Sequence, residues 1–217
     1  DGLIPVGTTG ESPTLSHQEH DRVVEICIEQ AAGRVPVIAG AGSNSTAEAV
    51  RLAEHAQKAG ADAVLIVSPY YNKPTQEGLY RHFTTVAGAV DVPVIIYDIP
   101  GRSIVRVADD TLARIVADYS NIGGIKDATG DVTRPPFLIT RFGNGFAQLS
   151  GEDATTLPYL AAGGHGAISV TSNIAPRQVS DMHKAWRLGD ITTAQEINRR
   201  LAPLHAAMFC EASPGPV

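Results

Sequence analysis

The feature that most constrains the fold of this chain is a series of short apolar runs that lack alternation between polar and apolar residues. There are seven such runs: GLIPVG (2–7), VPVIAG (35–40), AVLIVSP (63–69), VPVIIYDIP (92–100), IGGIK (122–126), FAQLSG (146–151) and GAISVTS (166–172). A strand that is apolar at consecutive positions is buried on both faces, which is typical of parallel sheets. We therefore expect seven parallel strands.

Helical stretches separate these runs. Ser16 with Glu19, and Ser45 with Glu48, have the spacing of a capping box at a helix start, and Gly60 is a helix-stop signal. The repeated order of strand, loop and helix indicates βα units, arranged either as a doubly wound sheet or as an eightfold barrel. Polar and glycine-rich residues follow the strands, where barrel enzymes place their chemistry, and this favours the barrel.

The sequence therefore predicts an α/β fold in which residues 1–217 form a single (β/α)8 TIM-barrel domain. The chain opens with DGLIPVGTTG, already inside a strand-like segment and without an initiating Met, and it ends abruptly in ASPGPV. We expect the first β/α unit of the barrel to be missing from this sequence.

Composition disfavours several classes of function. The net charge is -6 and the basic residues are scattered singly, which argues against a nucleic-acid surface. No apolar run approaches the roughly 18 residues that span a membrane. GAGSNS (40–45) imitates a dinucleotide-binding loop but lacks its third glycine. His17 and His20 lie one helical turn apart without a partner motif for zinc, so we expect no metal.

One apolar run, at 122–126, ends in Lys126. A buried ammonium is costly unless it is paired or gives up its proton. Two structural interpretations are an ion pair with Asp127 and a side chain that reaches past the strand end to solvent. The third is a nucleophile, because desolvation lowers the pKa of an amine and frees it to form a Schiff base with a ketone or aldehyde.

Polar residues also follow two earlier runs. In GTTGES (7–12), Thr8 and Thr9 offer hydroxyl and N–H groups suited to a carboxylate, although the segment also reads as an ordinary Gly/Thr turn. Tyr70 and Tyr71 lie in a loop bounded by prolines. Adjacent tyrosines there fit interface packing or, alternatively, a phenol that relays protons.

Tyr97 occupies the end of the run at 92–100, and Arg102 follows a Pro-Gly bend. An arginine fixed in such a turn grips a carboxylate with two hydrogen bonds, whereas the structural alternative is a surface arginine. Because the ends of barrel strands meet at one mouth, the convergence of Lys126 with Arg, Tyr and Thr side chains favours chemistry over structure.

These motifs, in their order and spacing, resemble the dihydrodipicolinate synthase family, which are Schiff-base aldolase-like barrels of the N-acetylneuraminate lyase superfamily. The resemblance covers essentially the whole chain and rests on GTTGES (7–12), SPYYNKP (68–74), YDIPGRS (97–103), GIKDATG (124–130) and LSGEDA (149–154). By comparison with the family, the final C-terminal helices are also expected to be missing.

The resemblance implies a condensation of pyruvate with L-aspartate-4-semialdehyde to 4-hydroxy-tetrahydrodipicolinate, in lysine and diaminopimelate biosynthesis. Lys126 would form a Schiff base with pyruvate, and no other cofactor is implied. Thr9, Tyr97 and Tyr71 match the proton relay of the family, with Tyr71 contributed by the neighbouring subunit of a tight dimer. The remaining matches are to substrate-binding positions: Arg102 for the semialdehyde carboxylate, Thr8 and the backbone of Ile168 for pyruvate, and Gly151 in the pocket wall.

The resemblance also implies a regulatory L-lysine site at a dimer interface, on residues that match its positions: Ser12, His17, His20, Asn44, Glu48 and Tyr70. His17 and His20 are expected to face Glu48 across a polar cleft. The family often assembles as a homotetramer, a dimer of tight dimers. Free metabolites as substrates make the cytoplasm the expected location.

One departure and two competing functions remain. Asp98 stands where family members commonly have Asn, and we expect only a local change in hydrogen bonding. N-acetylneuraminate lyases and 2-keto-3-deoxy sugar-acid aldolases share the lysine and the tyrosine, but Arg102 with Thr8 and Thr9 favours the synthase. A non-catalytic homologue would be expected to lose Lys126 or Tyr97, and this chain has both.

Overall fold

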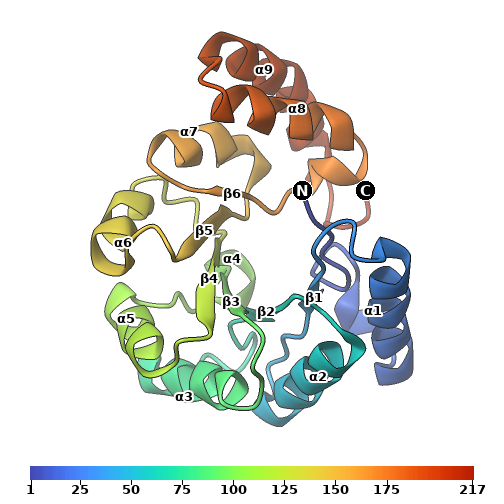
Figure 1. Cartoon of the computed structure of the whole chain (residues 1–217), viewed down its shortest axis with the longest axis vertical. Coiled ribbons are helices and arrows are strands. Elements are labelled where there is room, and N and C mark those ends of the chain that lie inside the picture. Colours follow the sequence, from blue (N-terminus) through green and yellow to red (C-terminus); the bar gives the residue numbers. More distant parts are fainter.

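The computed structural model describes residues 1–217. One curled parallel sheet of six strands, in the order β1-β2-β3-β4-β5-β6, lies inside a layer of helices (Figure 1). Its strands are β1 (Ile38–Gly40), β2 (Ala63–Val67), β3 (Val94–Asp98), β4 (Ile122–Asp127), β5 (Ala147–Ser150) and β6 (Gly166–Ala167). Each strand pairs in parallel with the next along the chain, so the expected α/β architecture is confirmed and six of the seven predicted strands are present.

The seventh prediction, a strand over 2–7, is wrong in extent. Only Leu3 forms a parallel bridge, to Val37, although the backbone N–H of Gly40 also donates to the Pro5 carbonyl at 3.0 Å. Pro5 has no N–H to donate in return, and Val6 has a left-handed φ of 48° that no regular strand allows. The segment therefore leaves the sheet after two residues and turns toward the sheet interior.

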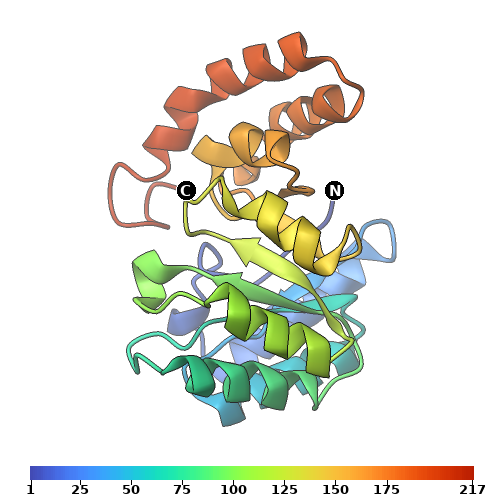
Figure 2. The same ribbon diagram turned by 90° about the vertical axis from the view of Figure 1, so that its left-hand side faces the viewer.

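Helices connect consecutive strands and continue past the last one. They are α1 (His17–Ala31), α2 (Thr46–Ala59), α3 (Gln76–Ala87), α4 (Pro100–Ser103), α5 (Asp109–Asp118), α6 (Arg134–Phe142), α7 (Thr156–Ala161), α8 (Pro176–Arg187) and α9 (Ile191–Ala207), with three short 3-10 helices, η1 (Ser12–Thr14), η2 (Asp153–Thr155) and η3 (Thr171–Asn173). Figure 2 shows α8 and α9 packed together at one end of the molecule. None of these helices combines the length and apolar character needed to cross a membrane.

The predicted helix ends are confirmed with one difference. Ser16 accepts a hydrogen bond from the N–H of Glu19, and the Glu19 carboxylate accepts one from the N–H of Ser16, which completes the capping box of α1. Ser45 caps α2 by accepting from the N–H of Glu48, but the Glu48 carboxylate turns away to other partners. Gly60 ends α2 in the left-handed conformation, with a φ of 97°.

The two faces of the sheet bury different groups. Ile66, Ile96 and Ile125, on successive strands, are fully buried and belong to the large apolar cluster formed with the surrounding helices. The intervening residues Leu65 and Tyr97 belong to a smaller cluster on the opposite, inner face. Side chains alternate along a strand, so each strand supplies one set to the helices and the other to the interior of the curled sheet.

We predict that Gly124→Ala destabilises the sheet by about 2 kcal/mol or more. A Cβ at Gly124 would lie 2.3 Å from the Ala147 carbonyl oxygen of the neighbouring strand, which neither backbone can relieve. Gly123→Ala is the matched control, because its nearest neighbour would be Pro93 Cβ at 3.3 Å. Urea unfolding of both variants measures the difference, and equal losses would contradict this account of Gly124.

Candidate active site

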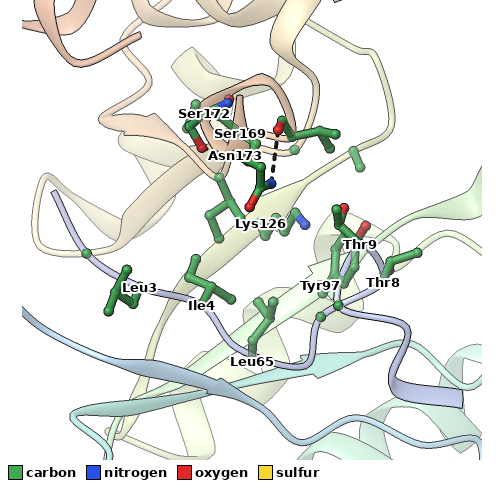
Figure 3. A pocket seen from close by; sticks show the side chains of 18 of the residues that line it. Leu3, Ile4, Thr8, Thr9, Leu65, Tyr97, Lys126, Ser169, Ser172 and Asn173 are labelled. Atoms are coloured by element: carbon green, nitrogen blue, oxygen red, sulfur yellow. Dashed lines mark hydrogen bonds between the residues drawn. The ribbon is translucent and has the colours of Figure 1, made fainter. Parts of the chain in front are cut away.

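The register between β3 and β4 places Tyr97 directly beside Lys126. Both side chains point to the inner face, and Lys126 Nζ lies 3.9 Å from the centre of the Tyr97 ring (Figure 3). Their successors in the sequence, Asp98 and Asp127, are also register partners and point to the outer face, where both contact Arg134. The alternative of an ion pair between Lys126 and Asp127 is therefore not what the structure shows.

Lys126 is desolvated rather than neutralised by a partner. Its residue is 8% exposed, and burial lowers the pKa of Lys126 to about 8, although the charges of Asp153 and Glu152 act in the opposite direction. The tyrosine ring below the ammonium offers only a cation–π contact. Of the three interpretations of this residue, the geometry supports an amine of raised nucleophilicity, because about a tenth of it is unprotonated at pH 7, far more than for a solvated lysine.

Lys126 opens into a cavity of about 1020 Å³. Seven of the predicted site residues line this cavity together: Thr8, Thr9, Tyr97, Arg102, Lys126, Gly151 and Ile168. Figure 3 shows Thr8, Thr9, Tyr97 and Lys126 pointing into the same space, with Leu65 and Ile4 forming an apolar floor. The fold thus brings side chains from the ends of separate strands together in one cavity.

Tyr97 is the phenol nearest to the amine. It is 5% exposed, and burial raises the pKa of Tyr97, while a hydrogen bond with the Thr8 side chain and the charge of Arg102 lower it. The Thr8–Thr9 turn is tight, because the N–H of Glu11 donates to the Thr8 carbonyl at 3.2 Å. Two hydroxyls and a phenol in one cavity are suited to passing protons to and from a group bound at Lys126.

Arg102 and Gly151 define opposite parts of the cavity wall. Arg102 lies in the single turn of α4, is exposed, and donates from Nη2 to the Ser213 carbonyl at 3.4 Å, so its fork of donors stays available at the entrance. A Cβ at Gly151 would lie 3.2 Å from Lys126 Cε and 2.7 Å from Ala128 Cβ. Glycine there leaves room for the lysine side chain.

Tyr71 is not part of this cavity. It is 87% exposed and has a φ of 71°, an unusual backbone conformation for a bulky residue. The loop holds the ring away from Lys126 of its own chain. Asn72 fixes this loop by donating from Nδ2 to the Asn44 carbonyl at 2.8 Å.

The residues matched to a regulatory site fall into two groups. His17 Nε2 lies 2.6 Å from Glu48 Oε1, and the Ser43 hydroxyl donates to the other Glu48 oxygen. These hydrogen bonds, that of Ser43 first, lower the pKa of Glu48. Ser12 and Tyr70 instead line a smaller cavity of about 230 Å³ that also touches the active-site residues Thr8, Tyr97 and Arg102.

The expectation that His20 faces Glu48 beside His17 is wrong. His20 is 5% exposed, and its Nδ1 lies 3.8 Å from Asp21. His20 is buried, and this desolvation lowers the pKa of its ring. A separation of three residues offsets the two side chains by about 60° around the helix axis, and this offset puts His20 on the buried side of α1 while His17 stays exposed.

Two features of the site were missed in the sequence. Glu152 lines the cavity next to Gly151, and burial with the neighbouring Asp153 raises the pKa of Glu152. Arg134 lies buried behind the reactive strands, with three carboxylates around it. The only sequence signal for Arg134 is that an aspartate directly follows each of the two reactive residues, in Tyr97-Asp98 and Lys126-Asp127. No group of three or more His, Cys, Asp and Glu side chains is arranged to hold a metal ion.

Comparison with known proteins supports one family. A model described as the dihydrodipicolinate synthetase family matches residues 1–217. The 4-hydroxy-tetrahydrodipicolinate synthase of Bradyrhizobium diazoefficiens is 59% identical over 216 residues, which are 100% of this chain and 73% of that protein.

Two solved structures are similar throughout. Chloride-inhibited dihydrodipicolinate synthase from Acinetobacter baumannii, complexed with pyruvate, has a TM-score of 0.94 at 47% identity, over 99% of this chain and 74% of that one. The enzyme from Cyanidioschyzon merolae, with lysine bound, has a TM-score of 0.94 at 38% identity, over 98% of this chain and 72% of that one.

We predict that Lys126→Met stabilises the protein by about 2 kcal/mol at pH 7. The pKa of Lys126 is about 8 when folded and is expected near its ordinary value of about 10.4 when unfolded, so below pH 8 the folded chain carries a charge it disfavours. Between about pH 8 and 10 the amine becomes neutral in the folded state, and the advantage of methionine shrinks. Urea unfolding at several pH values measures this trend.

The control is Lys58→Met, because Lys58 is exposed on α2. A surface substitution of this kind is expected to change stability by less than about 0.5 kcal/mol. A Lys126→Met variant no more stable than the wild type at pH 7 would contradict the desolvated state of the amine.

Proposed function

The chain belongs to the dihydrodipicolinate synthetase family, and we propose that its Lys126 cavity is the site that condenses pyruvate with L-aspartate-4-semialdehyde. The activity is that of a 4-hydroxy-tetrahydrodipicolinate synthase, a lyase of lysine and diaminopimelate biosynthesis. The observation that carries the assignment of the site is the unpaired, buried amine of Lys126 beside the Tyr97 phenol.

Lys126 acts as the nucleophile in this proposal. Its free amine adds to the carbonyl carbon of pyruvate, and loss of water gives a protonated Schiff base. That cation draws electrons from the methyl group, which loses a proton and leaves an enamine. The enamine carbon attacks the aldehyde of the semialdehyde, and ring closure by the substrate amine displaces Lys126 Nζ, which returns the enzyme to its starting state.

Three hydroxyl groups handle protons. Tyr97 and Thr9 line the Lys126 cavity together with Thr8, whose side chain lowers the pKa of Tyr97. Tyr71 completes the relay from the neighbouring subunit of a tight dimer. Its 87% exposure and its left-handed backbone, which projects the ring outward, support this role.

The substrate carboxylates have separate partners. Thr8, Thr9 and the backbone of Ile168 bind pyruvate next to Lys126, and Gly151 leaves space for the adduct. Arg102, at the exposed rim of the cavity, binds the carboxylate of the semialdehyde with its guanidinium fork. The sugar-acid aldolases of the superfamily have no need of such a carboxylate clamp at this position, so Arg102 favours the synthase.

The fold proposed for the active protein is a (β/α)8 barrel, and residues 1–217 are assigned to that one domain. Support comes from the curl of the six-stranded sheet and from the additional bridge at Leu3 (Figure 1). Homotetramers built from tight dimers, located in the cytoplasm where the free substrates occur, are part of the same proposal.

L-lysine is the proposed feedback inhibitor. The pair of His17 and Glu48 supplies charge complementary to an amino acid, and the Ser12 and Tyr70 cavity adjoins the active site through Arg102. A relative solved with lysine bound supports this ligand. His20 has no place in the proposed site because it is buried, and Asn44 contributes its backbone to the adjoining loop.

Borohydride reduction in the presence of pyruvate tests the site directly. We expect a reduced pyruvyl adduct on Lys126 alone, located by peptide mass spectrometry, because a Schiff base is reduced to a stable secondary amine. Lys126→Ala is expected to give no adduct. An adduct on another lysine, or none on a folded wild-type protein, would contradict the proposed site.

The same trapping experiment has a pH dependence with a known sign. Attack requires the unprotonated amine, and the pKa of Lys126 is about 8, so the initial trapping rate rises with pH through a midpoint near 8. A midpoint near 10 would show that the amine is solvated rather than buried.

Titration of initial rates with L-lysine tests regulation separately. We expect inhibition in the wild type, and inhibition weakened by about tenfold in His17→Ala, since the variant loses one charge-assisted contact. Arg22→Ala is the control, because Arg22 lies on the same helix and pairs only with Glu25 and Glu29. A flat response of the wild type at millimolar lysine rules out the regulatory site but leaves the catalytic assignment unchanged.

A further inference from the structure

Arg134, the first residue of α6, is the largest fully buried side chain in the protein. A single nitrogen, Nη1, donates to Asp98 Oδ2 at 2.8 Å and to Asp127 Oδ2 at 3.1 Å. The two carboxylates belong to different strands, β3 and β4. One guanidinium nitrogen therefore joins the ends of two strands that also pair through their backbones.

Each carboxylate is also fixed through its second oxygen. Asp98 Oδ1 accepts from the N–H of Val107 at 3.1 Å. Asp127 Oδ1 accepts from the N–H and the hydroxyl of Thr129 at 2.9 and 2.7 Å. Because both oxygens of both side chains are engaged, neither carboxylate can rotate without losing a charge-assisted hydrogen bond.

The position of this cluster relative to the reactive pair is set by the strands. Asp98 follows Tyr97, Asp127 follows Lys126, and both pairs are in register. Holding the outer pair fixes where the two strand ends lie, and the inner pair moves with them. The contacts of Arg134 on the outer face thus set the distance between Tyr97 and Lys126 on the inner face.

We propose that Arg134 is a positioning residue for the condensation: through Asp98 and Asp127 it holds the ends of β3 and β4 so that Tyr97 stays against Lys126. This inference rests on the proposed function. A gain in stability explains the buried cluster poorly, because the desolvation of the ions offsets most of the energy gained by pairing them. A role in placing the reacting groups explains it better, since small displacements of such groups reduce catalytic rates severely.

Arg134→Lys is the test variant, because it keeps the positive charge and loses the planar fork that reaches both strands. We expect the rate of borohydride-trapped adduct formation at saturating pyruvate to fall by about 10- to 100-fold. The pH midpoint of trapping is expected to rise by about one unit, because a displaced amine gains water. Circular dichroism and a melting curve establish that the variant is folded at the assay temperature.

The matched control is Asp109→Asn. Asp109 contacts the same guanidinium, with its Oδ1 2.8 Å from Arg134 Nη2, but it lies on α5 and touches neither reactive strand. We expect its trapping rate within about twofold of wild type and an unchanged midpoint. The groups that bear on the pH midpoint are Tyr97, Arg102, Glu152 and His183, which line the cavity with Lys126, and Asp153, whose charge acts on Lys126 from outside the lining. None of them is hydrogen-bonded to Arg134.

The outcomes separate the two levels of inference. A slow, alkaline-shifted Arg134→Lys beside a normal Asp109→Asn supports the positioning role. A folded Arg134→Lys with wild-type rate and midpoint, or equal defects in both variants, overturns it and leaves the proposed function standing. If the wild type itself forms no adduct, the proposed function fails and the role of Arg134 fails with it.

Should Arg134→Lys not fold, Asp127→Asn takes its place. Asparagine matches aspartate in size, but its amide nitrogen only donates, so one acceptor oxygen is left to serve either Arg134 or Thr129. The same slowing and the same alkaline shift are expected, and a normal profile in this variant overturns the proposal.

Discussion

The active site depends above all on the parallel register of β3 with β4. That register makes Tyr97 the neighbour of Lys126 and Asp98 the neighbour of Asp127. Because side chains alternate along a strand, one pair faces the interior of the curled sheet and the other faces α6. If β4 slipped by one residue against β3, Asp127 would turn into the cavity and Lys126 would turn to the outer face beneath a helix.

A nucleophilic Lys126 requires a desolvated environment, and burying an amine in this way costs the folded state stability. The amine is buried over an aromatic ring without a carboxylate partner, and its pKa falls to about 8 as a result. A closer carboxylate would stabilise the protein but would hold the proton on the amine. The strand directs the nearest candidate, Asp127, to the outer face, where Arg134 neutralises it. The fold thus separates a lysine from the acid that follows it in sequence.

Much of this arrangement could be predicted from local patterns. Consecutive apolar residues identified the parallel strands, and the polar residue at the end of one of them identified Lys126. The failures concern contacts between distant segments. Nothing in the run at 2–7 revealed the left-handed Val6 that ends its pairing, and the helical spacing of His20 did not say which face of α1 was buried. Arg134 was missed because its partners come from three other elements.

This geometry explains why an aspartate suits position 98. An asparagine at this position offers one acceptor oxygen, which has to serve either the N–H of Val107 or the guanidinium of Arg134. Aspartate serves both, through Oδ1 and Oδ2 respectively. Aspartate therefore places a negative charge beside a buried cation and completes the attachment of β3 to α6. Asp98 follows the reactive tyrosine directly in β3, so this contact holds the strand that carries Tyr97 from the outer face of the sheet.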